Sequence, residues 1–242
     1  MTSEIEWQAL NPARGEKGPR AGALWGSLRT EVSTGFLARF SDGFSSPPHI
    51  HNETYRAVVI SGLIHNDDPD AAKMWMPPGS FWTQPKGENH ITAVKKGTNG
   101  IALVEIDKGP YVVRPSEEAF DEGEKPINIV PSNIVWLDLP DENTARNGAK
   151  IAYLIGSLKE GYLNSTFIKL PMGFMGELHS NASVFHAVVI SGLLNYSDIE
   201  SRLLEPGSYF GSEGKKIHKF ASDNTETIIY VRTNSKYEII SQ

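Results

Sequence analysis

The heptapeptide Ala-Val-Val-Ile-Ser-Gly-Leu occurs twice, at Ala57–Leu63 and at Ala187–Leu193, and the two copies lie 130 residues apart. Repetition at a fixed spacing is typical of tandem copies of one structural unit. We therefore expect two similar domains that use nearly the whole chain. Further matches at offsets of 128 to 130 residues are Trp7 with Trp136, Leu24 with Leu154, Gly43 with Gly173, His49 with His179, Pro78 with Pro206 and His90 with His218.

Short stretches rich in valine, isoleucine, phenylalanine and tyrosine predict an all-β fold. Glycine, proline, asparagine and aspartate separate these stretches, and few windows show a sustained helical period. Many short strands with turn signals between them are typical of a sandwich or barrel. The expected strands are Phe36–Phe40, Arg56–Ile60, Gly100–Ile106, Tyr111–Arg114, Ala149–Leu154, Ser165–Leu170, His186–Ile190 and Glu226–Arg232.

The acidic segment Ser116–Lys125 is the best candidate for the connection between the two copies. Acidic residues cluster there with Gly123, and Pro126 follows directly. The segment could also carry one short helix. We expect a first domain at residues 1–120, which holds the metal site, and a second domain at residues 121–242.

Composition and charge exclude several classes of function. The formal net charge of −6 argues against nucleic-acid binding, which needs a basic surface. The chain contains no cysteine, which excludes disulfides, thiolate metal sites and cysteine nucleophiles and fits an intracellular protein. No apolar run approaches the length of a membrane span, and no signal-peptide pattern is visible. We expect a cytoplasmic protein whose partner is a small molecule, with no nucleic acid and no membrane.

Three histidines of the first copy have the spacing of metal ligands. His49 and His51 stand two residues apart, so their side chains point to the same side of an extended segment. His90, from a neighbouring strand, would complete the set and leave positions open for water or substrate. Neutral imidazole is a suitable ligand for several transition metals. We expect one divalent ion per chain, with iron, zinc, nickel and manganese all possible.

The residues around these histidines resemble the two sequence motifs of the cupin superfamily. The motifs read G-x5-H-x-H-x3,4-E-x6-G and G-x5-P-x-G-x2-H-x3-N. Tyr55 stands where the first motif has its glutamate, and Val94 replaces the final asparagine of the second. The resemblance implies a bicupin, with two tandem double-stranded β-helix barrels of the jelly-roll type. The matching residues are Gly43, His49, His51 and Gly62 in the first motif, and Gly79, Pro85, Gly87 and His90 in the second.

The second copy has lost part of the metal-binding pattern. By the repeat, Asn181 replaces His51 and Phe185 replaces Tyr55. Only His179 and His218 remain of the three candidate ligands, so a second metal site would be weak. We expect a degenerate second barrel that supports the first one, with His186 pointing outward because Phe185 points inward.

Other residues of the first copy are candidates for the pocket. Tyr55 would lie near the ion, where its hydroxyl could orient a bound water or donate to an oxyanion, although it could equally be a core tyrosine. Glu53 or Gln84 could supply a fourth ligand from an unusual position. Either Trp82 or its neighbour Phe81 should face the cavity, because side chains alternate along a strand.

Among the features of this site, the absence of the glutamate ligand is the most informative about function. Three neutral ligands leave the ion with its full positive charge, which favours an anionic or enolisable small molecule. The site resembles the iron sites of diketone-cleaving and thiol dioxygenases, and the chain more generally is similar to the zinc-binding cupins of ChrR-type anti-sigma factors. The resemblance implies either a metal-dependent enzyme, a dioxygenase or a lyase or isomerase, or a non-catalytic sensor or binding module. Cupin strand edges are often covered by pairing, so a homodimer is possible.

Overall fold

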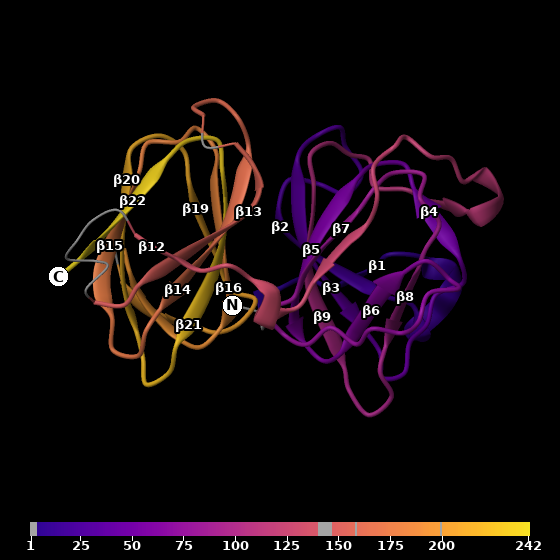
Figure 1. Ribbon diagram of the computed structural model, residues 1–242, viewed down its shortest axis with the longest axis horizontal. Helices are drawn as coiled ribbons and strands as arrows, with labels where there is room; N and C mark the ends of the chain where they lie inside the picture. The colour runs from indigo at the N-terminus through magenta and orange to yellow at the C-terminus, as the bar shows by residue number, and fades with distance from the viewer. Residues whose placement is uncertain (1–3, 140–146, 158, 199) are drawn as a thin grey trace. The chain divides into compact units, whose positions relative to one another are not determined.

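A computed structural model describes residues 4–139, 147–157, 159–198 and 200–242, with the backbone alone described at Ala13 and Arg14. The chain divides into two compact units at Asn133 and Ile134 (Figure 1). The expected linker Ser116–Lys125 is therefore wrongly placed, because this segment belongs to the first unit. The strand β11 (Ile127–Ile129) pairs with β7 (Phe81–Gln84) of that unit, which extends it beyond residue 120.

The first unit contains one large sheet. Its strands are antiparallel to their neighbours, and several pair with strands that are distant in the sequence, as expected for a jelly roll. The order across the sheet is β1 (Gln8–Ala9), β2 (Arg20–Trp25), β3 (Thr34–Phe40), β9 (Gly100–Ile106), β5 (Tyr55–Ser61), β7 and β11.

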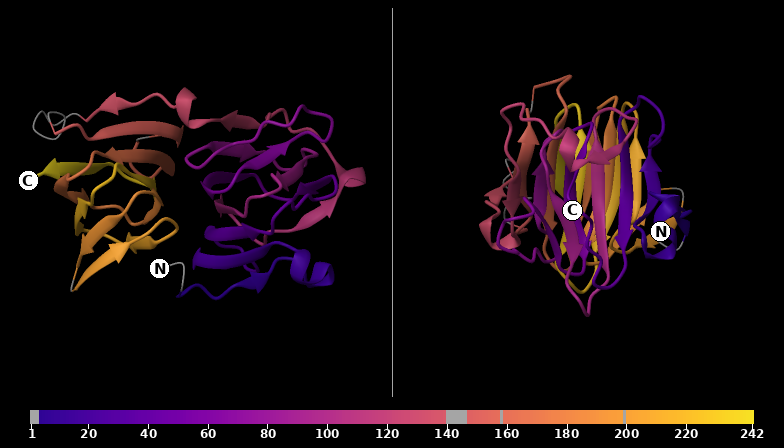
Figure 2. Two further views of the ribbon diagram at one scale, coloured as in Figure 1. Left: turned by 90° about the horizontal axis from the view of Figure 1, so that it is seen from below. Right: turned by 90° about the vertical axis from the view of Figure 1, so that its right-hand side faces the viewer.

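Two shorter strand pairs form the opposite layer of the first unit (Figure 2). The strand β4 (His49–His51) pairs with β10 (Val113–Pro115), and β6 (Ile64–Asp67) pairs with β8 (Ile91–Val94). Apolar side chains from both layers share one core, which buries Phe36, Ala57, Ile64, Trp82 and Val94 among others.

The second unit repeats this arrangement with an independent core. Its fold and that of the first unit are double-stranded β-helix jelly rolls. One sheet has the order β12 (Leu137–Asp138), β13 (Lys150–Gly156), β14 (Asn164–Leu170), β21 (Thr227–Thr233), β16 (Phe185–Ser191) and β19 (Tyr209–Ser212). The other has the order β18 (Ser201–Leu204), β17 (Leu194–Ser197), β20 (Lys216–Ser222), β15 (Met175–Ser180) and β22 (Tyr237–Ser241).

The internal repeat is visible in structural detail. The repeated heptapeptides lie on β5 and β16, and each strand has one irregularity in register, at Val59/Ser61 and at Val189/Ser191. A cation also covers a tryptophan ring in each unit. Arg39 lies 4.3 Å from the centroid of Trp7, and Lys169 lies 4.3 Å from the centroid of Trp136. The two heptapeptides are thus equivalent strands, as the sequence predicts.

The observed strands agree with those expected from composition and turn signals. All eight expected stretches overlap a strand, and Gly100–Ile106 matches β9 at both ends. The short helix expected in Ser116–Lys125 is a single 3₁₀ turn, η3 (Ser116–Glu118). Within the described residues, no helix has the length and apolar character needed to cross a membrane.

Candidate metal centre

The three candidate ligands converge where β4 meets the start of β8. The backbones of His49 and His90 exchange two N–H···O=C hydrogen bonds, each 3.0 Å long, which fixes the two residues side by side. His51 follows two residues later on β4 and points to the same side. One nitrogen from each ring lies within 4.8 Å of the other two. This cluster is the only group of three such ligands found among the described residues.

Backbone carbonyls orient two of the three rings. The Nδ1 atom of His49 lies 2.9 Å from the carbonyl oxygen of Pro47, and the Nδ1 atom of His90 lies 3.1 Å from that of Glu88. A carbonyl can only accept, so each Nδ1 carries the proton and each Nε2 presents a lone pair. A hydrogen-bond acceptor for the ring N–H is typical of histidines that bind metals through the other nitrogen.

Burial keeps two of the rings neutral. Burial lowers the pKa of His51 well below its ordinary value, and the neighbouring His90 and His49 lower it further. Burial and His49 together lower the pKa of His90 to about 3. Because neutral imidazole is the form that binds metals, the donor set fits one divalent ion without a carboxylate ligand.

Two tyrosine hydroxyls face the histidine cluster. The Tyr55 hydroxyl lies 3.4 Å from Nε2 of His90, as expected from its place in the motif. The Tyr111 hydroxyl lies 3.2 Å from Nε2 of His51, and its ring stacks on that of His51 at 4.5 Å. Sequence reasoning assigned Tyr111 to a strand but not to the site. The pairing of β10 with β4 brings Tyr111 to the site, and no local sequence motif predicts this pairing.

His49, His51, Tyr55 and Tyr111 line a small cavity of about 100 Å³. Its lining is mainly apolar, and Trp82 belongs to it whereas Phe81 does not. A ligand that reached the cluster would therefore bury apolar surface and meet few polar groups. The lining residues are Leu10, Asn11, Pro19, Phe36, Ala38, Phe40, Phe44, Ser46, His49, His51, Tyr55, Trp82, Thr92, Val104, Tyr111 and Val113.

The two proposed extra ligands do not join the histidines. Glu53 lies in the bend that follows β4 and is absent from the ligand cluster. Gln84 is fully buried, and both ends of its amide are in use. It accepts a hydrogen bond from Asn66 at 2.9 Å and donates one to the carbonyl of Glu88 at 3.1 Å.

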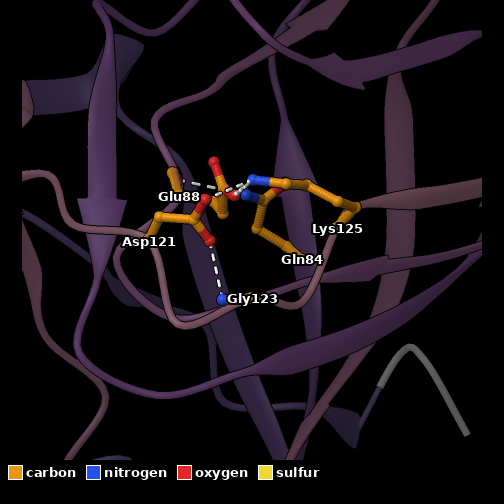
Figure 3. A network of polar contacts seen from close by, with 5 residues as sticks. All are labelled: Gln84, Glu88, Asp121, Gly123 and Lys125. Atoms are coloured by element: carbon orange, nitrogen blue, oxygen red, sulfur yellow. Dashed lines mark hydrogen bonds and ion pairs between the residues drawn. The ribbon is translucent and has the colours of Figure 1, made fainter.

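The segment once expected to be a linker supports the loop that carries His90. Figure 3 shows Lys125 between Glu88 and Asp121, at 2.6 Å and 2.9 Å, with Gln84 beside this group. Asp121 also accepts a hydrogen bond from the backbone N–H of Gly123 at 2.7 Å. These contacts hold residues 120–125 against the loop between β7 and β8.

Gly87 fixes the same loop through its backbone. It has a φ of 76°, and its N–H donates to the carbonyl of His51 at 2.9 Å. Its own carbonyl accepts from the N–H of Phe120 at 3.0 Å. A tight turn is present at Gly87, and it connects the loop of His90 directly to the strand of His51.

The second unit does not bring its two histidines together. His218 is fully buried and bonds the hydroxyls of Tyr196 at 2.7 Å and Ser212 at 3.0 Å. His179 is half-buried on the other side of β15 and contacts Glu177 at 2.8 Å. The weak second site of His179 and His218 is therefore a wrong prediction.

A difference in register explains this failure. In the first unit, Ser45 pairs with Ala93 and His49 with His90, so the first strand uses one residue more than its partner. In the second unit no such extra residue exists, and Leu178 lies opposite His218. A shift of one residue moves a side chain to the opposite face of a strand, so His179 points away from the interior.

Comparison with known proteins places the chain in a family. A family model described as "Domain of unknown function (DUF4437)" matches residues 1–240. No curated protein matches the chain. A proposed dioxygenase of Nostoc punctiforme has a similar structure, with a TM-score of 0.75 and 12% identity over 100% of this chain and 85% of that chain.

Two further solved structures share the fold. A variant of salicylate 1,2-dioxygenase from Pseudoaminobacter salicylatoxidans, in complex with gentisate, has a TM-score of 0.61 and 14% identity over 96% of this chain and 81% of that chain. A variant of oxalate decarboxylase from Bacillus subtilis has a TM-score of 0.60 and 15% identity over 99% of this chain and 78% of that chain. These likenesses show a cupin fold alone. The chain thus belongs to the DUF4437 family and is built on the cupin fold.

Proposed function

We propose that His49, His51 and His90 hold one divalent metal ion and that the first unit is a metal-dependent enzyme acting on a small anionic or enolisable molecule. The observation that carries this proposal is the cluster of three imidazoles, two of which, His49 and His51, line a mainly apolar cavity. An ion bound there would supply Lewis acidity towards an anionic ligand. A dioxygenase, or a lyase or isomerase, is the reaction class that we favour.

Other residues of the cavity would bind and orient the ligand. The apolar walls would exclude water and hold the carbon skeleton of the ligand. Tyr55 and Tyr111 would provide its hydrogen-bonding environment, because both hydroxyls lie beside the histidines. Burial raises the pKa of Tyr55 to about 12, so this hydroxyl keeps its proton at neutral pH.

Metal analysis of matched variants tests the proposal. We expect about one ion per chain in the wild type, and loss of that ion in His49→Ala and in His90→Ala. His179→Ala and His218→Ala are the matched controls from the second unit, and both should keep the metal. Retention of metal in His90→Ala, or its loss in His179→Ala, would refute the assignment of the site.

A non-catalytic sensor or binding module of the ChrR type is the alternative. It uses the same metal site and predicts ligand binding without turnover. A screen with the iron-loaded protein separates the two functions. Diketones, thiols, keto acids and small phenols are added in turn, and oxygen uptake is measured for each. Spectral shifts without oxygen uptake or product would favour the sensor over the dioxygenase.

A further inference from the structure

A chain of buried hydrogen bonds runs from the backbone of Glu88 to the hydroxyl of Tyr55, and its direction can be determined. The carbonyl oxygen of Glu88 can only accept, so the atom of Gln84 at 3.1 Å from it is the amide nitrogen. The other end of the Gln84 amide is then its oxygen. That oxygen lies 2.9 Å from Asn66, so Asn66 presents its nitrogen to Gln84.

The oxygen of the Asn66 amide consequently faces two hydroxyl groups. It lies 2.9 Å from the hydroxyl of Tyr55 and 2.7 Å from that of Thr92. An amide oxygen has no proton to give, so the Tyr55 hydroxyl must donate its only proton to Asn66. All these side chains are buried, so water does not compete for the contacts. Tyr55 thus has only lone pairs left to offer to the histidine cluster.

Tyr111 is placed differently. Among the contacts of the described residues, its hydroxyl has one polar neighbour, the Nε2 atom of His51 at 3.2 Å. An ion bound to that nitrogen would occupy its lone pair, and the proton of Tyr111 would then be available for a ligand. The two hydroxyls therefore have opposite roles.

We infer that Tyr55 accepts and Tyr111 donates a hydrogen bond at the metal centre, so that the site selects small acids with a protonated oxygen beside an anionic one, such as 2-hydroxy acids. The hydroxyl of the acid donates to Tyr55, and its carboxylate accepts from Tyr111. This inference rests on the proposed metal site and reverses the role first expected for Tyr55. Asn66 is a positioning residue, because it fixes the direction of the Tyr55 proton.

Three acids of nearly equal size test this inference. Lactate carries a hydroxyl donor at its second carbon, 2-methoxypropanoate carries an ether that cannot donate, and pyruvate carries a carbonyl that only accepts. Each is titrated into the cobalt(II)-substituted full-length protein at pH 7, and binding is followed by the visible absorption of the metal. The measurement needs no turnover. Wild type, Tyr55→Phe, Tyr111→Phe and Thr92→Val are compared, and circular dichroism confirms that each is folded.

We expect lactate to bind the wild type about three- to tenfold more tightly than the other two acids, the value of one buried hydrogen bond. Tyr55→Phe should reduce this ratio to about one. Tyr111→Phe should weaken all three acids by about tenfold or more and keep the ratio, because it removes a hydrogen bond to a charged group. Thr92→Val removes the other hydroxyl that donates to Asn66 and should keep the ratio.

Contrary results have distinct meanings. Equal binding of the three acids by the wild type, a preference for pyruvate, or an unchanged ratio in Tyr55→Phe would overturn the inference. A second contrary result is that cobalt binds the wild type and is lost in His90→Ala, but its absorption does not change with any of the acids. That result would overturn the inference and leave the proposed metal site standing. Failure to bind cobalt at all would refute the proposed function itself, and the inference with it.

Discussion

Replacing Gly87 by alanine should destabilise the first unit and weaken metal binding together. The residue has a φ of 76°, a conformation that costs an L-residue about 1–2 kcal/mol. A Cβ atom there would also lie 2.6 Å from the carbonyl oxygen of Phe120 and 2.7 Å from its ring. Such overpacking adds about 1–3 kcal/mol. We therefore expect Gly87→Ala to lower the free energy of unfolding by about 2–5 kcal/mol.

Gly97→Ala provides the matched control. Gly97 has a φ of 88° in the same unit, and no atom lies within 4 Å of the position of its Cβ. This variant should show only the conformational cost of about 1–2 kcal/mol. Urea unfolding of the metal-free protein, followed by tryptophan fluorescence, measures both values as shifts in the midpoint at a constant slope.

Metal affinity separates the two variants further. Gly87 donates to the carbonyl of His51 and precedes His90 by three residues, so a displaced loop moves two ligands. Disturbing the support of a ligand typically costs about 10- to 100-fold in metal affinity. Competition with a chromophoric chelator should show this loss in Gly87→Ala and none in Gly97→Ala. Equal stability and equal affinity of the two variants would refute the role assigned to the turn.

Two further predictions concern the second unit and the repeat. Burial lowers the pKa of His218 to about 4, below its value of about 6.5 in an unfolded chain, so its contribution to stability is lost as pH falls from about 6.5 towards 4. The titration of His218 should therefore account for a loss of about 2 kcal/mol in the stability of the second unit between pH 7.5 and 5, and His218→Gln should abolish that part of the slope in urea unfolding. Arg39→Met and Lys169→Met should each lower the free energy of unfolding by about 0.5–1 kcal/mol, because each removes an equivalent cation–π contact. Thermal melting of both variants measures the two losses. Clearly unequal losses would argue against the equivalence of the two contacts.

Local patterns were sufficient to predict much of the fold. The repeated heptapeptide identified β5 and β16 as equivalent strands, because side-chain alternation and the following turn glycine are encoded within a few residues. The spacing of His49, His51 and His90 likewise predicted their convergence. Both inferences depend on short-range geometry, which follows directly from the spacing of residues in the sequence.

The features that were missed depend on long-range pairing. Tyr111 enters the site because β10 pairs with β4, about sixty residues away in the sequence. Asn66 acquires its role only through contacts with three different strands. The error at His179 came from a single extra residue before His49, which changes the face of a strand without disturbing the sequence match. The sequence prediction placed the domain boundary at residue 120, too early by comparison with the observed boundary at Asn133. The error arose because β11 matches no sequence motif that would reveal its pairing with β7.

X-ray absorption spectroscopy of the zinc- or cobalt-loaded protein tests the central claim most directly. The structure predicts a first shell that contains three imidazole nitrogens at about 2.0–2.1 Å, completed by light atoms. His90→Ala should lose the metal or show one imidazole fewer, whereas His218→Ala should give the wild-type spectrum. Fewer than three imidazoles in the wild type, or an unchanged spectrum in His90→Ala, would contradict a metal centre formed by His49, His51 and His90.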